Sequence, residues 1–240
     1  MKSFKLIRSC AASADYNMAL DEKILTQYLD DGIGLFRTYR WQGPSFTYGF
    51  HQDPRSQIDL ARCASDGIQV AKRITGGGIL FHNDEITYSF VCNKADVGEP
   101  EGMFVSYREI CAFLMRFYKS LNLNPMFALQ EKNFRNRSVV HQLCCASNEK
   151  YDIVIDSRKI GGNAQKRKRH VVFQHGSIPC SINWGFVRRY LKYVPSDIAE
   201  HVTNLANELK VVPEKDILEE KLIEAFECCF NVRFYETRLA

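Results

Sequence analysis

The first regular pattern along the chain is an apolar stripe at helical spacing between residues 15 and 29. Its members are Tyr16, Leu20, Ile24 and Tyr28, with Leu25 and Leu29 beside them. Side chains four residues apart share one face of an α-helix, so the stripe predicts an amphipathic helix packed against a core. Gly32 is the expected end of this helix. Asp21, Glu22 and Gln27 fall off the stripe and are predicted to face solvent.

Short apolar runs bounded by glycine and proline predict strands in the next segment. These runs are residues 35–41, 45–50, 68–71 and 86–91. Residues 59–66 are predicted to form a helix that stops at Gly67. Strands that alternate with single helices are typical of a mixed central β-sheet covered by helices, so we expect an α/β (α+β) fold.

Another helix has a well-marked beginning in the middle of the chain. Ser106 and Glu109 match a capping box, and the helix is expected to reach Leu121. Its apolar stripe is rich in aromatic residues, and the helical spacing predicts packing in the core in preference to a cofactor site. The polar residues 130–138 show no periodicity and are predicted to form a surface loop.

Residues 151–160 predict a β-hairpin around Asp156 and Ser157, and residues 171–178 predict a strand that returns beside it. The basic run at residues 166–170 lies between them, in a predicted turn. A solvated surface is the usual role of such a run, and docking of a partner is the alternative.

The remainder of the chain, from Trp184, is predicted to be helical, with an amphipathic last helix and an edge strand at residues 232–235. No repeat, low-complexity tract or interdomain linker interrupts the sequence. We therefore expect residues 1–240 to form a single domain. It would consist of a core of residues 1–183 and a helical C-terminal extension of residues 184–240.

Composition supports one compact domain and excludes several classes of function. Hydrophobic residues make up 45% of the chain, enough to close a core without disulfides. The net charge of +4 is too mild to indicate a nucleic-acid partner, although it is compatible with an acidic protein partner. Nine cysteines without a C-x-x-C spacing exclude a disulfide scaffold and a zinc knuckle, so no metal is expected and a reduced cytoplasm fits best. No apolar run approaches a signal core or a membrane span, so no membrane partner is expected.

Three consecutive glycines, Gly76, Gly77 and Gly78, stand between two predicted strands. Glycines remove Cβ where a backbone turns sharply or passes close to a ligand. A phosphate-binding loop would need Lys and Ser/Thr after the last glycine, and a dinucleotide fingerprint would need a helix there. The apolar residues 79–81 supply neither, which excludes a nucleotide fold of these kinds. A glycine-rich β-turn without a ligand remains the alternative.

Further motifs give the glycine segment a context. Residues 72–90 resemble the Arg-Arg-x-Thr-Gly-Gly loop, with its later His and Thr-Tyr-Ser, of the biotin/lipoate protein ligase superfamily. Residues 158–165 and 174–178 resemble its Lys-x-x-Gly-[Ser/Asn]-Ala-Gln and His-Gly-Ser motifs, and residues 16–22 its opening helix. This resemblance implies a biotin/lipoate ligase-like catalytic domain. The residues that it assigns to substrate binding are Arg73, Thr75, Gly76, Gly77, Gly78, His82, Gly162, Asn163, Ala164, His175 and Gly176.

The resemblance also makes Lys159 the first catalytic candidate. In the ligases of this superfamily the matching lysine contacts the acyl carboxylate and the adenylate phosphate, and in the transferases it lies beside the reacting thioester. Both roles use a compact positive charge where negative charge develops. The alternative is a surface lysine in a turn.

Cys144 is the candidate nucleophile. One transferase branch resembles Cys-x-x-x-x-Ser-x-Tyr before the lysine hairpin, and Cys144, Tyr151 and Lys159 keep these intervals. A nearby cation such as Lys159 can lower the pKa of a thiol from about 8.5 into a reactive range. Cys145 is adjacent, Glu149 stands where the branch has serine, and a buried structural cysteine is the alternative.

The motifs divide between two classes of enzyme. Gly78 and Asn163 resemble the ligases, whereas residues 84–89 and 174–177 resemble the transferase branch. The bacterial one-chain ligases carry an accessory domain after this one, and few residues follow Ile178, which favours a transferase. Both histidines of the motifs could orient a substrate or donate to an oxyanion, or they could brace their loops through backbone hydrogen bonds. Likewise, the fork of the loop arginine suits a carboxylate or phosphate but could also brace the loop.

The resemblance therefore implies an enzyme that moves an octanoyl or lipoyl group from octanoyl-acyl carrier protein to a lysine of a lipoyl-carrier domain. The acceptor would be of the glycine cleavage H protein or dehydrogenase E2 type. In this expectation Cys144 forms an acyl-enzyme and no cofactor is required. The first alternative is the catalytic half of a lipoate-protein ligase, which needs ATP, Mg²⁺ and a separate accessory chain. The second is a noncatalytic carrier-binding relative.

Overall fold

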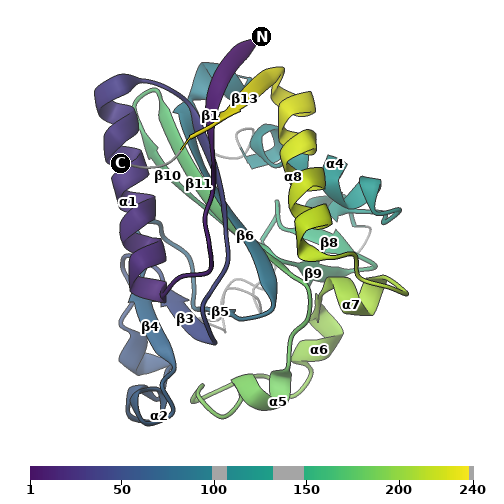
Figure 1. Ribbon diagram of the computed structural model, residues 1–240. Helices are drawn as coiled ribbons and strands as arrows, with labels where there is room; N and C mark the ends of the chain where they lie inside the picture. Colours follow the sequence, from purple (N-terminus) through teal and green to yellow (C-terminus); the bar gives the residue numbers. More distant parts are fainter. Residues whose placement is uncertain (99–106, 132–148, 238–240) are drawn as a thin grey trace.

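The computed structural model describes residues 1–98, 107–131 and 149–237 of the chain. A six-stranded mixed sheet runs through the molecule in the order β10-β11-β6-β2-β1-β13 (Figure 1). Its strands are β1 (Lys2–Arg8), β2 (Leu35–Tyr39), β6 (Glu85–Asn93), β10 (Gly162–Lys168), β11 (Val171–Pro179) and β13 (Val232–Glu236). The pairs β1–β2 and β1–β13 are parallel, and the other neighbours are antiparallel. The predicted mixed α/β fold is confirmed.

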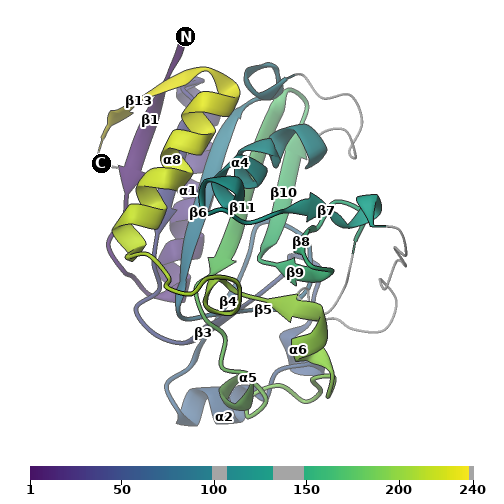
Figure 2. The ribbon, with the colours of Figure 1, turned by 90° about the vertical axis from the view of Figure 1, so that its right-hand side faces the viewer.

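Helices cover both faces of this sheet. Helix α1 (Ala14–Asp31) lies on one face, and α4 (Ala112–Ser120) and α8 (Lys215–Phe230) lie on the other (Figure 2). Alternate strand residues face opposite sides of a sheet, so Val91 packs on the α1 side while Phe90 packs on the α4 and α8 side. The two faces therefore have separate cores.

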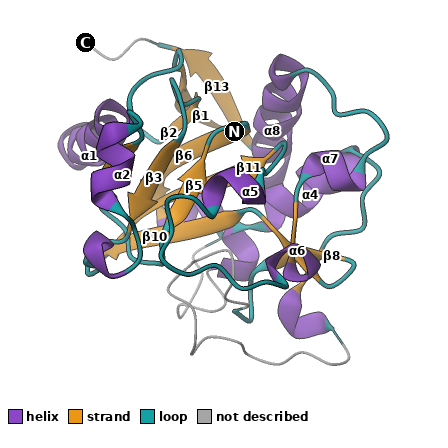
Figure 3. Cartoon of the chain, turned by 90° about the horizontal axis from the view of Figure 1, so that it is seen from below, coloured by secondary structure: helices purple, strands orange, loops and turns teal. Residues whose placement is uncertain are grey.

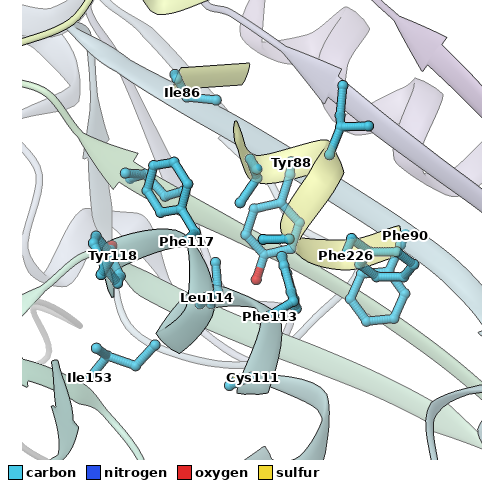
Figure 4. Close-up of a cluster of buried hydrophobic side chains, with 14 of the residues drawn as sticks. Ile86, Tyr88, Phe90, Cys111, Phe113, Leu114, Phe117, Tyr118, Ile153 and Phe226 are labelled. Carbon is cyan, nitrogen blue, oxygen red and sulfur yellow. The ribbon is translucent and has the colours of Figure 1, made fainter. Parts of the chain in front are cut away.

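Aromatic rings dominate the core beneath α4 and α8 (Figure 4). Phe226 of α8 lies 4.7 Å from Phe36 and 5.2 Å from Phe113 of α4 between ring centroids, and Tyr88 meets Phe113 edge to face at 5.2 Å. Tilted and edge-to-face pairs of this kind are the favoured aromatic geometries. The aromatic stripe of the middle helix is thus a packing surface, as predicted.

Two smaller sheets adjoin the main one. The first has the order β4-β3-β5, with β3 (Ser45–Tyr48), β4 (Gln69–Lys72) and β5 (Leu80–His82). The second has the order β12-β9-β8-β7, with β7 (Met126–Phe127), β8 (Ile153–Ile155), β9 (Arg158–Ile160) and β12 (Val202–Thr203). Asp156 and Ser157 link β8 to β9 with φ of 46° and 63°, the left-handed pair that a two-residue hairpin turn requires. The predicted hairpin is confirmed.

Short helices complete the structure. They are α2 (Leu60–Ser65), α5 (Trp184–Val187), α6 (Ile198–His201) and α7 (Leu205–Glu208), with 3₁₀ turns η1 (Pro54–Ser56), η2 (Lys94–Val97) and η3 (Ala128–Gln130). Figure 3 shows the strands between α1 and α2 on one side and α4, α7 and α8 on the other. Among the described residues, no helix has the length and apolar character needed to cross a membrane.

The segment after Trp184 is joined closely to the rest of the chain. Strand β13 pairs with β1, and Lys2 lies opposite Val232. Leu222 and Phe226 of α8 belong to the same core cluster as residues of β2 and β6. The sequence patterns predicted this last helix and edge strand, but they did not predict β1, β5 or β12.

The predicted orientation of the first helix is wrong. Asp21 was expected in solvent, but its exposed fraction is 1%, whereas Tyr16 of the expected apolar stripe is 58% exposed. The buried face carries Asn17 as well as Asp21, and both bind the guanidinium of Arg37 on β2. A buried arginine therefore allows two polar residues to occupy the inward face of α1.

The basic run is also placed differently from the prediction. Residues 166–168 belong to strand β10, and only Arg169 and His170 form the turn to β11, with Arg169 at a φ of 46°. The proposed cap at Ser106 and nearly all of the predicted surface loop at 130–138 lie outside the described residues.

Candidate active site

The glycine loop, residues 73–79, connects β4 to β5 and is held against the end of β3. The amide of Phe50 donates to Thr75 O at 2.8 Å, and Gly77 has a φ of +93° that favours glycine. A Cβ on Gly49 would lie 2.1 Å from Gly77 O, so two backbone segments meet here without room for a side chain. The loop is therefore shaped by contacts inside the protein.

Gly49→Ala is expected to destabilise the protein by about 1–3 kcal/mol, because its methyl group must displace the backbone of the glycine loop. Gly43→Ala is the matched control, as a Cβ there meets nothing within 4 Å. Urea unfolding of the two variants tests this, and equal stability would contradict it.

Arg73 braces the loop from beneath. It is buried, and its Nη2 donates to Gly78 O at 2.5 Å and to Gly76 O at 3.3 Å. Its Nη1 donates to Thr47 Oγ1 at 2.8 Å. The sequence allowed this arginine either to bind a substrate or to brace the loop, and these contacts brace the loop.

His82 links Thr47 to a buried carboxylate. Its Nε2 lies 2.6 Å from Thr47 Oγ1, and its Nδ1 lies 2.8 Å from Glu85 Oε1. The ring stacks on Trp41 with 4.0 Å between centroids, and the Trp41 indole N–H donates to the same Glu85 oxygen at 2.9 Å. His82 is thus held by side chains and not by the nearby backbone bonds that were considered from the sequence.

Glu85 remains ionised in spite of its burial. Burial alone raises its pKa, but the charge of His82 and hydrogen bonds from His82, Thr87 and Ser177 outweigh that effect and hold the pKa below 4.5. Ser177 donates to Oε2 at 2.8 Å, so both carboxylate oxygens accept hydrogen bonds. A buried anion with this many donors is stable in place.

A second carboxylate–histidine pair supports the other side of the loop. His175 Nδ1 lies 2.9 Å from Asp21 Oδ2, and His175 Nε2 lies 2.7 Å from Thr75 Oγ1. Burial, aided by the charges of Arg73 and His82, lowers the pKa of His175 below 6.5, although Asp21 opposes the shift. Asp21 also pairs with Arg37, so its charge is already shared. Neutral His175 donates through Nδ1 to the carboxylate and accepts from the Thr75 hydroxyl.

Acidification is expected to reduce the free energy of unfolding in two steps. The folded pKa of His175 and the folded pKa of Glu85 both lie below the ordinary values of these groups. In each case the unfolded chain binds the proton first. The stability contributed by each group is therefore complete above its ordinary pKa and is lost as the pH falls towards its folded pKa.

Urea unfolding between about pH 8 and about pH 3 measures this dependence, with a limiting slope of about 1.4 kcal/mol per pH unit for each proton. His175→Gln should flatten the loss that begins near the ordinary histidine pKa of about 6.5, and Glu85→Gln the loss that begins near the ordinary glutamate pKa of about 4.3. A wild-type stability that does not change between these two values would contradict the assignment to His175.

A pocket opens beside these histidines. Of the predicted binding residues, those that line it are Arg73, His82, Gly162, Ala164, His175 and Gly176. Its other walls are Met18, Tyr39, Trp41, Thr47, Leu80, Thr87 and Ser177. A larger pocket adjoins it and shares Leu80, Gly162 and Ser177. The two pockets are therefore neighbours that share part of a wall.

The other predicted binding residues support the walls. Thr75 bonds His175, and Asn163 Oδ1 accepts from the hydroxyl of Tyr88 at 2.7 Å. Gly76, Gly77 and Gly78 belong to the loop behind Arg73. The two glycine motifs thus lie around the smaller pocket. Some of their residues line the pocket, and others contact the residues that line it or neighbours of those residues.

Lys159 lies on β9 next to the larger pocket. Its exposed fraction is 4%, and its Nζ donates to Asp152 Oδ2 at 2.8 Å. Two residues later Gly161, with a φ of +74°, and Gly162 line that pocket. Lys159 is therefore a buried, ion-paired lysine rather than a surface residue in a turn. Cys144, the predicted nucleophile, lies outside the described residues.

Sequence patterns alone missed Asp21, Thr47, Trp41 and Glu85, which hold the two histidines. A signal for Asp21 exists, since it follows Met18 by three residues and precedes Ile24 by three, on the helical face that is buried. Within the described part of the chain, no group of His, Cys, Asp and Glu residues could hold a metal ion.

A glycine-bordered pocket, two buried carboxylate–histidine pairs and a buried lysine together are typical of an enzyme active site. The family model of the lipoyl protein ligase A/B catalytic domain matches residues 13–230, so the chain belongs to this family.

Curated relatives agree with this assignment. The chain is 29% identical over 245 residues to the octanoyltransferase LipM of Kyrpidia tusciae, covering 97% of this chain and 89% of the relative. It is 28% identical to LipM of Clostridioides difficile, covering 98% and 90%. LipM of Oceanobacillus iheyensis is 32% identical over 183 residues, covering 76% of this chain and 66% of that protein.

Solved structures share the fold. A bi-partite lipoate protein ligase from Thermoplasma acidophilum superposes with a TM-score of 0.78 at 19% identity and covers all of this chain and 88% of its own. A lipoate-protein ligase A bound with ATP gives a TM-score of 0.78 at 22% identity, covering all of this chain and 90% of its own. At these identities the likeness establishes the fold of the domain.

Proposed function

We propose that the protein is an octanoyltransferase that moves an octanoyl group from a carrier-protein thioester to a lysine of a lipoyl-carrier domain. The observation that carries the proposal is the buried, ion-paired Lys159, two residues before Gly161, which lines the larger pocket. Relatives named octanoyltransferase that align with nearly the whole chain support it. We treat residues 1–240 as the single catalytic domain that performs the reaction.

In the proposed mechanism the thiolate of Cys144 attacks the carbonyl carbon of the thioester. The new C–S bond forms as the carrier's thiolate leaves and takes up a proton, which gives an acyl-enzyme. The amine of the target lysine then attacks the acyl-enzyme, loses a proton, and expels the Cys144 thiolate as an amide bond forms. The ammonium of Lys159 and backbone amides near the glycine loop stabilise the oxyanion of both steps.

The two pockets suit the parts of such a substrate. The smaller pocket has apolar walls from Met18, Tyr39 and Leu80, which fit an acyl chain lying along the glycine loop. The larger one leaves room for the arm that delivers the thioester. In the ligase alternative the same room would hold the nucleotide of an acyl-adenylate.

The test is intact-mass analysis after mixing the protein with octanoyl-carrier thioester in the absence of ATP and Mg²⁺. A thioester is already activated, whereas a free acid must first become an adenylate, so only a transferase gives an adduct here. We expect a mass increase of one octanoyl group. An unmodified protein that lipoylates a carrier when given lipoate, ATP and a second chain would replace this proposal with the ligase. Carrier binding with no acyl movement under any condition would indicate a noncatalytic relative.

A further inference from the structure

An exposed aromatic ring with two ammonium groups over it lies at the edge of the glycine loop. Phe50 is 47% exposed, and the Nζ atoms of Lys72 and Lys166 lie 4.4 and 5.5 Å from its ring centroid. Contacts at these distances are cation–π pairs, which hold the two lysines at fixed positions. Lys168 follows on β10 and is also exposed. We name Phe50, Lys72, Lys166 and Lys168 the lysine surface.

The lysine surface is next to the pocket. The amide of Phe50 donates a hydrogen bond to the carbonyl oxygen of Thr75, and Lys72 directly precedes the glycine loop. Lys166 comes two residues after Ala164, which lines the smaller pocket, so the two Cα atoms are about 7 Å apart along the strand. Residues two apart share a face of a sheet, which puts Lys166 and the pocket on the α1 side.

Charge is distributed unequally between the two edges of the six-stranded sheet. At the β13 edge, Arg8 and Arg40 pair with carboxylates of α8 and β13. At the β10 edge, none of the ion pairs formed among the described residues includes Lys72, Lys166 or Lys168. Positive charge that is not neutralised therefore gathers beside the pocket, where it attracts an anionic partner.

We infer that the lysine surface docks an acidic patch on the protein domain that presents the acceptor lysine. This inference rests on the proposed function. The acceptor's reacting amine is at the end of a single lysine side chain, which is shorter than the donor's arm, so the acceptor domain must contact the enzyme close to the pocket. A donor thioester on a long flexible arm has no such restriction, and its carrier can sit farther away. Lysines beside the pocket that have no ion-pair partner among the described residues match the acceptor's requirement.

The test compares a charge-reversed double variant, Lys72→Glu/Lys166→Glu, with the control Lys119→Glu. Lys119 is exposed on α4, which covers the opposite face of the sheet. Binding of a fluorescently labelled, unmodified lipoyl-carrier domain of the dehydrogenase E2 type is measured by anisotropy at several salt concentrations. We expect the double variant to bind at least about tenfold more weakly and with less dependence on salt, and the control to bind like wild type.

A milder pair, Lys72→Gln/Lys166→Gln, should give an intermediate loss, and thermal unfolding verifies that each variant is folded. Formation of the acyl-enzyme from octanoyl-carrier thioester should keep its wild-type rate. Unchanged acceptor binding in both double variants would overturn the inference. A slower acylation step with acceptor binding intact would also overturn it, because that result would assign the lysine surface to the donor. Charge-dependent binding without acyl transfer by the wild type would instead contradict the proposed function and leave the docking surface standing.

Discussion

Lys159→Arg is expected to lower the rate of octanoyl transfer by about 10²–10³-fold, even though it keeps the positive charge. The side chain is buried on β9 and its ammonium sits 2.8 Å from Asp152 Oδ2. A planar guanidinium is larger and presents its hydrogen bonds in a fixed fork, so it cannot take the position of a compact ammonium in an enclosed site. Lys159→Ala should be equally or more impaired, because it removes the charge that stabilises the oxyanion.

Arg158→Gln is the control for this prediction. Arg158 is the neighbouring cation on the same strand, but it is partly exposed and pairs with Glu208 at 2.9 Å. Its replacement should leave transfer within a few-fold of wild type. Rates of acyl-enzyme formation are measured by quenched-flow mass analysis on variants shown by circular dichroism to be folded. Near-normal transfer by either Lys159 variant would remove this lysine from the mechanism.

Cys144→Ala is expected to abolish the acyl-enzyme and to reduce transfer by as much as about 10⁶-fold, the scale of losing a catalytic nucleophile. Several other cysteines are poor nucleophiles. Burial raises the pKa of Cys63 and Cys180 to about 11 and that of Cys111 to about 12, which keeps these thiols protonated at neutral pH. None of these three cysteines is therefore expected to replace Cys144 as the nucleophile.

Cys145→Ala is the matched control and should keep most of the activity. Adjacent side chains generally point in different directions, so two neighbouring sulfurs do not reach the same carbonyl carbon. Peptide mapping of the octanoylated protein should place the adduct on Cys144. An adduct on Cys145, or equal loss of transfer in the two variants, would show that Cys144 is not the nucleophile.

The predicted binding residues of the glycine motifs included six that line the smaller pocket, but the motifs did not predict the contacts that these residues make. His82 and His175 were expected to orient a substrate or to bond nearby backbone. Each is instead one member of a chain that joins a buried carboxylate to a threonine, and Thr75 lies on the glycine loop itself. Glu85 lies near His82 in sequence, whereas Asp21 is distant from His175, so only the fold could reveal the second pair.

Local patterns determined those features of the protein that depend on near neighbours in the chain. The helix that ends at Gly32, the hairpin around Asp156 and Ser157, and the strand at 171–178 each follow from side-chain spacing or turn chemistry within a few residues. The aromatic helix stripe was likewise predicted to pack, because apolar side chains at that spacing leave water together.

Tertiary structure alone decided which polar residues are buried and what they bind. Asp21 was predicted in solvent because it falls off the apolar stripe. It is buried because Arg37 and His175, from two strands of the sheet, offset the cost of burying an ionised side chain. The pairing of β1 with β13 joins the two ends of the chain, and the placement of Lys166 beside Phe50 joins β10 to the end of β3. Such contacts join residues that are far apart in the sequence. They depend on the free energy of burial in the assembled fold, so no short stretch of sequence can predict them.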